Sequence, residues 1–227
     1  MMAFNWQDES QLKWNDMAEY WNQTSESMWE KGSRKDIIPF IKGFVPPGRS
    51  ICDLGCGDGY GSLLLAKHGY SVVGIDLAKE MIEKAKQRII EDNIRFIQGS
   101  MTETPFADEE FDGVMAINSV EWNESPLLAL KEMARITKTN GFACVGILGP
   151  TAAPRVNSYD RLYGKPAVCH TVMPWEFSQL AKENGWELAG NLPVYKREVK
   201  SELADPLPLL LKQALSFMWV VMLKKIN

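Results

Sequence analysis

Short apolar runs alternate along the chain with longer segments in which apolar residues recur at helical spacing. The runs are rich in β-branched or aromatic residues and bounded by Gly, Asn or Asp, which is typical of buried strands. The five clearest runs are Ile51–Leu54, Tyr70–Ile75, Ile94–Ile97, Phe111–Ile117 and Phe142–Leu148. The helical segments between them are Leu63–Lys67, Met81–Ile90 and Leu127–Ile136. This alternation predicts a parallel sheet with helices on both faces.

Residues that favour helix ends support these boundaries. Ser125 before Pro126 has the form of an N-cap followed by the first helical residue, and Asn140-Gly141 has the form of a helix stop. Another helix is expected to begin at Pro174, where apolar residues again follow at helical spacing. Its stop is expected at Gly185, directly before a strand from Trp186.

The most apolar stretch of the chain, Leu207–Leu223, is interrupted by Lys212 and Gln213 and barely reaches the length needed to span a bilayer. It is better interpreted as a short helix followed by a core strand, Phe217–Leu223. With a further strand from Trp186, the fold class is α/β: a doubly wound, Rossmann-like, seven-stranded, mainly parallel sheet with helices on both faces.

Length and charge narrow the classes of protein. A chain of 227 residues suits one α/β domain. A net charge of -4 argues against the large basic surface that binds nucleic acid. The four cysteines form no CxxC pair and suggest reduced, structural thiols. Because the N-terminus shows no secretory signal, we expect a cytoplasmic protein that binds neither nucleic acid nor membrane, and no metal.

A glycine-rich turn follows the first predicted strand. Residues 53–59 read Asp-Leu-Gly-Cys-Gly-Asp-Gly and lead into a helix. In open α/β folds ligands bind at this edge of the sheet, and the free N–H groups of the helix favour a negative group. A dinucleotide loop needs G-x-G-x-x-G or G-x-G-x-x-A, but the third position holds Tyr60 or Ser62, depending on the starting glycine.

The pattern present is D-x-G-x-G-x-G, and here the sequence resembles the first motif of the class I S-adenosylmethionine-dependent methyltransferases. The ordered resemblance covers roughly residues 34–148. It implies that Asp76, at the tip of the second strand, accepts hydrogen bonds from the cofactor ribose. Its spacing from the loop suits NAD as well, so Asp76 alone does not discriminate. Ser100 departs from the pattern, because many members of the family have Asp there.

The resemblance implies a set of cofactor-binding residues that follow the first four strands. Asp53 could contact the cofactor or only orient the loop. The fourth motif lacks the Pro-Pro-aromatic signature of enzymes that methylate adenine amines, since Asn118 is followed by Ser119. The expected cofactor residues are Asp53, Gly55, Cys56, Gly57, Asp76, Leu77, Ser100, Met101, Asn118 and Ser119.

Two segments outside these motifs are candidates for covering the site. Residues 1–33 place aromatic residues at helical spacing, which indicates either core packing or, from the family, a helical lid on the methyltransferase domain of residues 34–227. Residues 149–173 follow the fifth strand and are expected to cover the acceptor. His170 and Tyr159 are their candidate catalytic residues, although a solvated loop position for His170 is the plainer interpretation.

The predicted function is S-adenosylmethionine-dependent, in-line methyl transfer to a small-molecule acceptor. Such transfer depends mainly on alignment of the two reactants, which can lower the free-energy barrier by ~7 to 11 kcal/mol. The alternatives are a non-catalytic S-adenosylmethionine-binding protein and, against the glycine pattern, an NAD(P)-dependent oxidoreductase. The sequence leaves open the acceptor, the atom methylated and the oligomeric state.

Overall fold

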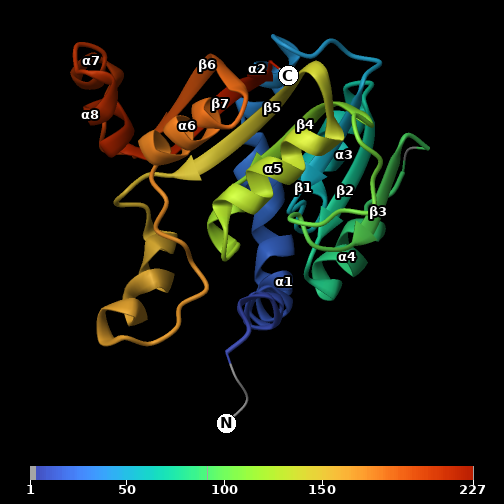
Figure 1. Ribbon diagram of the computed structural model, residues 1–227, viewed down its shortest axis with the longest axis horizontal. Coiled ribbons are helices and arrows are strands. Elements are labelled where there is room, and N and C mark those ends of the chain that lie inside the picture. Colours follow the sequence, from blue (N-terminus) through green and yellow to red (C-terminus); the bar gives the residue numbers. More distant parts are fainter. Residues whose placement is uncertain (1–3, 91, 227) are drawn as a thin grey trace.

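Seven strands form a single sheet in the computed structural model, which describes residues 4–90 and 92–226. The order is β3-β2-β1-β4-β5-β7-β6; the first five strands are parallel, and β7 runs antiparallel to both of its neighbours (Figure 1). The strands are β1 (Ser50–Leu54), β2 (Ser71–Asp76), β3 (Ile94–Gln98), β4 (Phe111–Ile117), β5 (Thr137–Leu148), β6 (Trp186–Tyr195) and β7 (Ser216–Lys225). The predicted fold class is confirmed.

Alternate residues of the central strands face two separate cores, one on each side of the sheet. Ile51 of β1 packs with the helices α2, α3 and α4, whereas Cys52 and Leu54 pack with α5 and α6. Every one of these strand residues is buried, as expected for a parallel sheet covered on both faces. The helices are α1 (Trp6–Glu30), α2 (Ile37–Lys42), α3 (Tyr60–Lys67), α4 (Lys79–Lys86), α5 (Pro126–Ile136), α6 (Pro174–Glu183), α7 (Ser201–Ala204) and α8 (Leu209–Ala214), with 3-10 turns η1 (Val120–Trp122) and η2 (Ala153–Tyr163).

One predicted helix end is wrong. Asn140-Gly141 does not stop a helix, because α5 ends at Ile136 and the chain turns directly into β5. Asn140 instead adopts φ +64° within β5, where the pairing with β4 shifts register. An Asn-Gly pair favours a left-handed turn, and here that turn forms an irregularity in a strand. The predicted N-cap is confirmed, since Ser125 Oγ accepts the N–H of Leu128.

The fourth helix is shorter than predicted. It was expected to continue to Ile90, but α4 ends at Lys86, and Ile89 and Ile90 are exposed. Beyond Ala85 the apolar residues no longer face the sheet, so periodicity alone overestimated the length.

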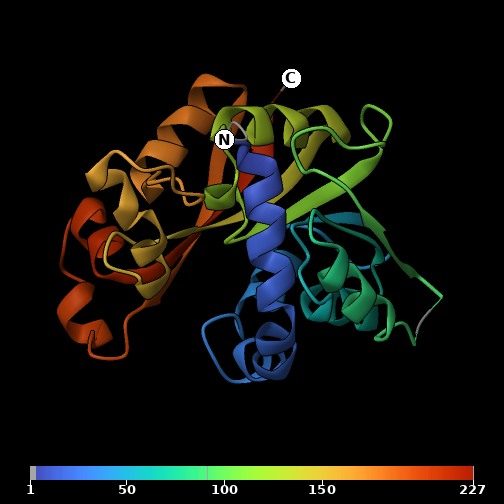
Figure 2. The ribbon, with the colours of Figure 1, turned by 90° about the horizontal axis from the view of Figure 1, so that it is seen from below.

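The helix α1 crosses the edge of the sheet at which the parallel strands end (Figure 2). Its first turn is capped by Asn5, and Trp6 Nε1 donates to the Trp122 carbonyl at 2.8 Å. Gln11 Nε2 donates to the Leu77 carbonyl at 3.0 Å. The helix therefore lies across the turns that follow β2 and β4. Within the described residues, no helix combines the length and apolarity needed to cross a bilayer.

Candidate functional site

The glycine-rich turn joins β1 to α3 at the carboxyl edge of the sheet. Gly55, Gly57 and Gly59 all have positive φ, between +56° and +78°. At Gly55 a Cβ atom would also overlap the side chain of Ser119. Only glycine accommodates both this backbone and this approach. The turn consequently brings the ends of β1 and β4 together at one place.

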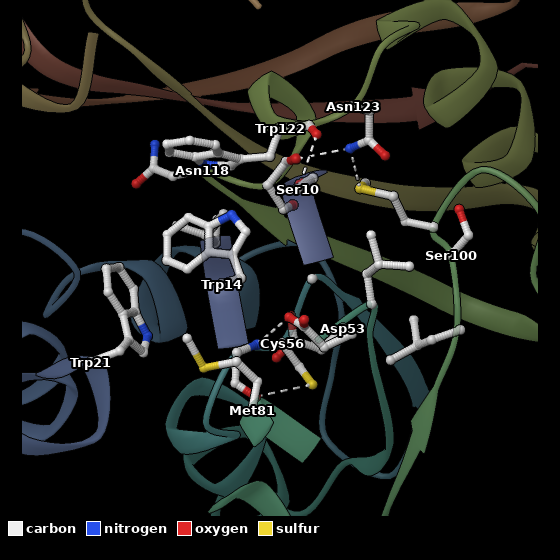
Figure 3. A pocket seen from close by; sticks show the side chains of 18 of the residues that line it. Ser10, Trp14, Trp21, Asp53, Cys56, Met81, Ser100, Asn118, Trp122 and Asn123 are labelled. Atoms are coloured by element: carbon white, nitrogen blue, oxygen red, sulfur yellow. Dashed lines mark hydrogen bonds between the residues drawn. The ribbon is translucent and has the colours of Figure 1, made fainter. Parts of the chain in front are cut away.

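A cavity beside this turn collects residues from four loops and from α1 (Figure 3). All ten residues expected from the sequence to bind a cofactor line it: Asp53, Gly55, Cys56, Gly57, Asp76, Leu77, Ser100, Met101, Asn118 and Ser119. Their convergence is a structural finding, whereas their contact with a cofactor remains a prediction. Within the described residues, no cluster of three or more side chains is placed to hold a metal ion.

Two carboxyl groups lie under the turn, Asp53 buried and Asp76 half-buried. Asp76 Oδ2 accepts the N–H of Gly57 at 2.8 Å, and Oδ1 accepts that of Ala78 at 2.9 Å. Asp53 Oδ2 accepts a hydrogen bond from Ser62 Oγ on α3 at 2.5 Å. Burial raises the pKa of Asp53 to about 7 and that of Asp76 to about 6. Both residues thus hold the loop in shape, and each carboxyl oxygen retains capacity to accept a further bond.

The turn after β4 is strained. Asn118 has φ +54°, which is uncommon for a residue other than glycine. Its amide donates weakly to the Gly146 carbonyl at 3.4 Å, while Ser119 Oγ donates to the Leu54 carbonyl at 2.8 Å. Strain of this kind concentrates at functional sites, where the surrounding structure holds it in place. The polar end of Asn118 is accordingly fixed at the cavity.

At the β3 side of the cavity, Ser100 replaces the expected acidic residue. Its hydroxyl lies 2.8 Å from Thr102 Oγ1 and accepts the N–H of Thr102. Met101 Sδ accepts from Asn123 Nδ2 at 2.9 Å. The Ser100 hydroxyl is therefore hydrogen-bonded within its own loop. An adenine ring placed there would find its polar partners mainly among backbone groups.

Sequence reasoning missed Arg34, a buried cation that also lines the cavity. Its guanidinium lies over the rings of Trp21 and Trp29, 4.7 and 5.6 Å from the ring centroids. Its side-chain hydrogen bond runs to Asn118 Oδ1 and is long, at 3.4 Å. Burial lowers the pKa of Arg34 to about 10, so it stays charged at neutral pH. No motif precedes it to mark this role; by contrast, the helical spacing of aromatic residues did mark Trp14 and Trp21 of α1.

A second cavity of about 620 Å³ adjoins the first. The two share five lining residues: Trp14, Trp21, Arg34, Asn118 and Trp122. The second is also lined by Pro154 and Asn157 of η2 and by Phe217 of β7. The segment after β5 therefore does contribute to a wall of the site.

The structure does not bring the two predicted catalytic residues to either cavity. His170 Nδ1 accepts the N–H of Val172 at 3.1 Å, and burial lowers the pKa of the imidazole. Tyr159 is 53% exposed and packs against Tyr163, with ring centroids 5.8 Å apart. Neither is among the residues that line the cavities. Their catalytic role stays a prediction, which this placement does not favour.

Comparison with known proteins agrees with this geometry. A family profile described as a methyltransferase domain matches residues 52–145. A demethylmenaquinone methyltransferase from Renibacterium salmoninarum is 32% identical over 150 residues, which cover 65% of this chain and 62% of that protein. A malonyl-[acyl-carrier protein] O-methyltransferase from Erwinia pyrifoliae is 28% identical over 152 residues, covering 66% of this chain and 55% of that protein. The match thus spans less than two thirds of either relative.

Solved structures share the whole fold. A methyltransferase from Haloferax volcanii, determined in complex with the Trm112 methyltransferase activator, superposes with a TM-score of 0.70 at 18% identity. The superposition covers 95% of this chain and 98% of that chain. This likeness shows that the two chains share the fold.

Proposed function

We propose that the chain transfers the methyl group of its cofactor to a small-molecule acceptor held in the second cavity. The premise is that it belongs to the class I S-adenosylmethionine-dependent methyltransferases. One observation carries the proposal: the ten expected cofactor residues line one cavity, and a second, larger cavity adjoins it. Acceptor and cofactor would therefore meet beside Asn118 and Trp122, which line both cavities.

The residues present fit S-adenosylmethionine part by part. Asp76 can accept from the ribose hydroxyls, and the segment of Ser100 and Met101 can hold the adenine. Gly55 and Gly57 allow close backbone approach to the methionine part. When bound, the cofactor supplies an activated methyl group on sulfur, so no protein acid is needed for departure of the leaving group.

Arg34 fits the one carboxylate of the cofactor. Arg34 is a buried cation whose one hydrogen bond within the described residues is long and whose other contacts are two indole rings, which is costly unless it gains an anionic partner. Asp53, Asp58 and Glu121 act on it only through space. We assign Arg34 to the cofactor carboxylate, which would satisfy its free donors bidentately.

The proposed lid is the N-terminal half of α1. The first cavity encloses about 90 Å³, well below the ~300 to 1,000 Å³ of typical small-molecule sites. Entry of the cofactor then requires an outward movement of Trp14 and its helix, which returns over the bound cofactor so that Lys13 and Trp14 again lie beside Trp122. The N-terminal half is held by part-buried hydrogen bonds from Trp6 and Gln11, which the movement must break. The C-terminal half is held by the buried Asp58 of the glycine loop, which accepts from Ser25 Oγ and Arg88 Nη2. We therefore place the movement before Ser25.

The remaining assignments follow from composition and placement. Residues 149–173 are proposed to cover the acceptor through the η2 residues at the second cavity. The net charge of -4 supports the absence of a nucleic-acid partner, and the four buried, unpaired cysteines suit the reducing cytoplasm.

Calorimetry separates the alternatives. S-adenosylmethionine and S-adenosylhomocysteine should both bind, and NAD should not; heat with NAD alone would overturn the proposal in favour of an oxidoreductase. A screen of candidate acceptors with methyl-labelled cofactor then distinguishes an enzyme from a protein that only binds the cofactor. Labelled product formed in proportion to enzyme concentration is the expected result.

A further inference from the structure

Aromatic rings form part of the walls of the second cavity. Trp14, Trp21, Trp122, Tyr20 and Phe217 line it, and the exposed lining is largely apolar. Trp14 lies edge-on to Trp122, with ring centroids 4.8 Å apart. Aromatic rings prefer stacked or edge-on aromatic partners. A ligand with a flat ring therefore fits these walls best.

Three charged residues line this cavity: Lys13, Arg34 and Asp16. Arg34 is assigned to the cofactor, and of the other two, Asp16 is exposed whereas Lys13 is half-buried. Lys13 Nζ lies 5.9 Å from the centroid of the Trp122 ring, and Arg34 lies over Trp21. Because cations of the protein already stand over these two rings, a cationic ligand would be repelled from the aromatic surface that otherwise attracts it.

Lys13 is the cation available to an acceptor. It forms no ion pair within the described part of the chain, and it lines the second cavity but not the first. Arg34, by contrast, lines both and is fully buried beside the cofactor residues. The two cations therefore suit two different anions.

We infer that the acceptor is a planar aromatic molecule with one acidic group, whose ring packs against Trp122 and whose anion pairs with Lys13. This inference rests on the proposed function and adds the substrate class. The acidic group is recognised at the rim, and the ring extends toward Asn118 and the cofactor.

Three probes of similar size test shape and charge separately: 2-naphthoate, 2-naphthylmethylammonium and octanoate. Their affinities are measured by calorimetry on the full chain saturated with S-adenosylhomocysteine. We expect 2-naphthoate to bind at least about 10-fold more tightly than either of the others, which corresponds to ~1.4 kcal/mol. Equal or tighter binding of octanoate would overturn the planar ring, and equal or tighter binding of the ammonium would overturn the acidic group.

Two matched variants of α1 test whether 2-naphthoate binds in the second cavity. Met17→Glu puts a carboxylate into the wall of the second cavity, while Leu12→Glu puts the same charge at an exposed position that lines neither cavity. Met17→Glu should weaken 2-naphthoate binding at least about 10-fold, and Leu12→Glu less than about 2-fold. Equal losses would show that the probe binds elsewhere or by net charge alone.

Lys13→Met tests the ion pair directly. It should weaken the binding of 2-naphthoate about 3- to 10-fold, as expected for a partly solvated pair, and leave the affinity for S-adenosylhomocysteine unchanged. Unchanged 2-naphthoate affinity would remove Lys13 from the site. Failure of S-adenosylhomocysteine itself to bind the parent protein would instead refute the proposed function, so the two failures are distinguishable.

Discussion

The carboxylate of Asp76 accepts the backbone N–H of Gly57 at 2.8 Å, which joins the tip of β2 to the glycine-rich turn. The same carboxylate caps the N–H of Ala78. Asp76 therefore has two tasks: it shapes the loop, and it faces the cavity as the proposed partner of the ribose. Substitutions that keep or remove its oxygens separate the two.

Asp76→Ala should weaken S-adenosylhomocysteine binding by about 10- to 150-fold, because hydrogen bonds to a charged group contribute ~1.5 to 3 kcal/mol. Calorimetry measures the affinity, and circular dichroism checks the fold. Asp76→Asn keeps one acceptor oxygen for the loop and should lose less. An unchanged affinity in a folded Asp76→Ala variant would move the ribose site elsewhere.

Arg34→Met should weaken the binding of S-adenosylhomocysteine by about 10- to 150-fold, because hydrogen bonds between charged groups contribute ~1.5 to 3 kcal/mol. 5′-Methylthioadenosine lacks the amino-acid portion and serves as the control ligand. Its affinity should change less than about 3-fold in the variant. If both ligands lose affinity equally, Arg34 supports the fold of the site and does not contact the carboxylate.

The raised pKa of Asp53 predicts a pH-dependent effect on stability. Burial raises this pKa from an ordinary value of 3.8 to about 7. Between these values the folded protein binds more protons than the unfolded chain, so the contribution of Asp53 to the free energy of unfolding falls as pH rises.

Asp53→Asn removes this titration while keeping an oxygen to accept from Ser62. Relative to the parent, the variant should therefore gain stability from pH 4.5 to pH 7.5. Urea unfolding at pH 4.5, 6 and 7.5 measures the difference. A difference that does not vary with pH would mean that Asp53 has an ordinary pKa in the folded protein.

Gly61→Ala should destabilise the protein although alanine favours helices. Gly61 lies in α3, where a Cβ atom would overlap the ring of Trp29 on α1. Forcing the ring away should cost about 1 to 3 kcal/mol of the free energy of unfolding. Gly43→Ala is the milder control, because its φ of -69° suits any residue and a Cβ atom would only come within 3.3 Å of the Phe40 carbonyl oxygen; its effect should stay below about 1 kcal/mol. Equal urea midpoints for the two variants would contradict this packing.

The strands and the glycine-rich loop could be predicted from the sequence because both depend on local patterns. Apolar runs such as Phe111–Ile117 coincide with the strand observed, and a parallel sheet places all their carboxyl ends at one edge. Asn140-Gly141 misled because the same left-handed turn serves helix ends and strand irregularities. Arg34 could not be found, since its role arises from rings that α1 brings over it from earlier in the chain.

The placement of His170 argues against a general base and leads to the final prediction. Its Nδ1 lone pair accepts the N–H of Val172, so the neutral ring carries its proton on Nε2 and has no free lone pair. Burial lowers its pKa, which keeps the ring neutral near pH 7. His170→Asn offers an amide oxygen to Val172 and preserves the local fold. Once a labelled-methyl screen has supplied an acceptor, the single-turnover rate of His170→Asn should stay within about 3-fold of the parent, whereas a base would cost about 10²- to 10⁴-fold. A loss in that larger range, with S-adenosylhomocysteine affinity unchanged, would restore His170 as the catalytic base and require the segment after β5 to rearrange when the acceptor binds.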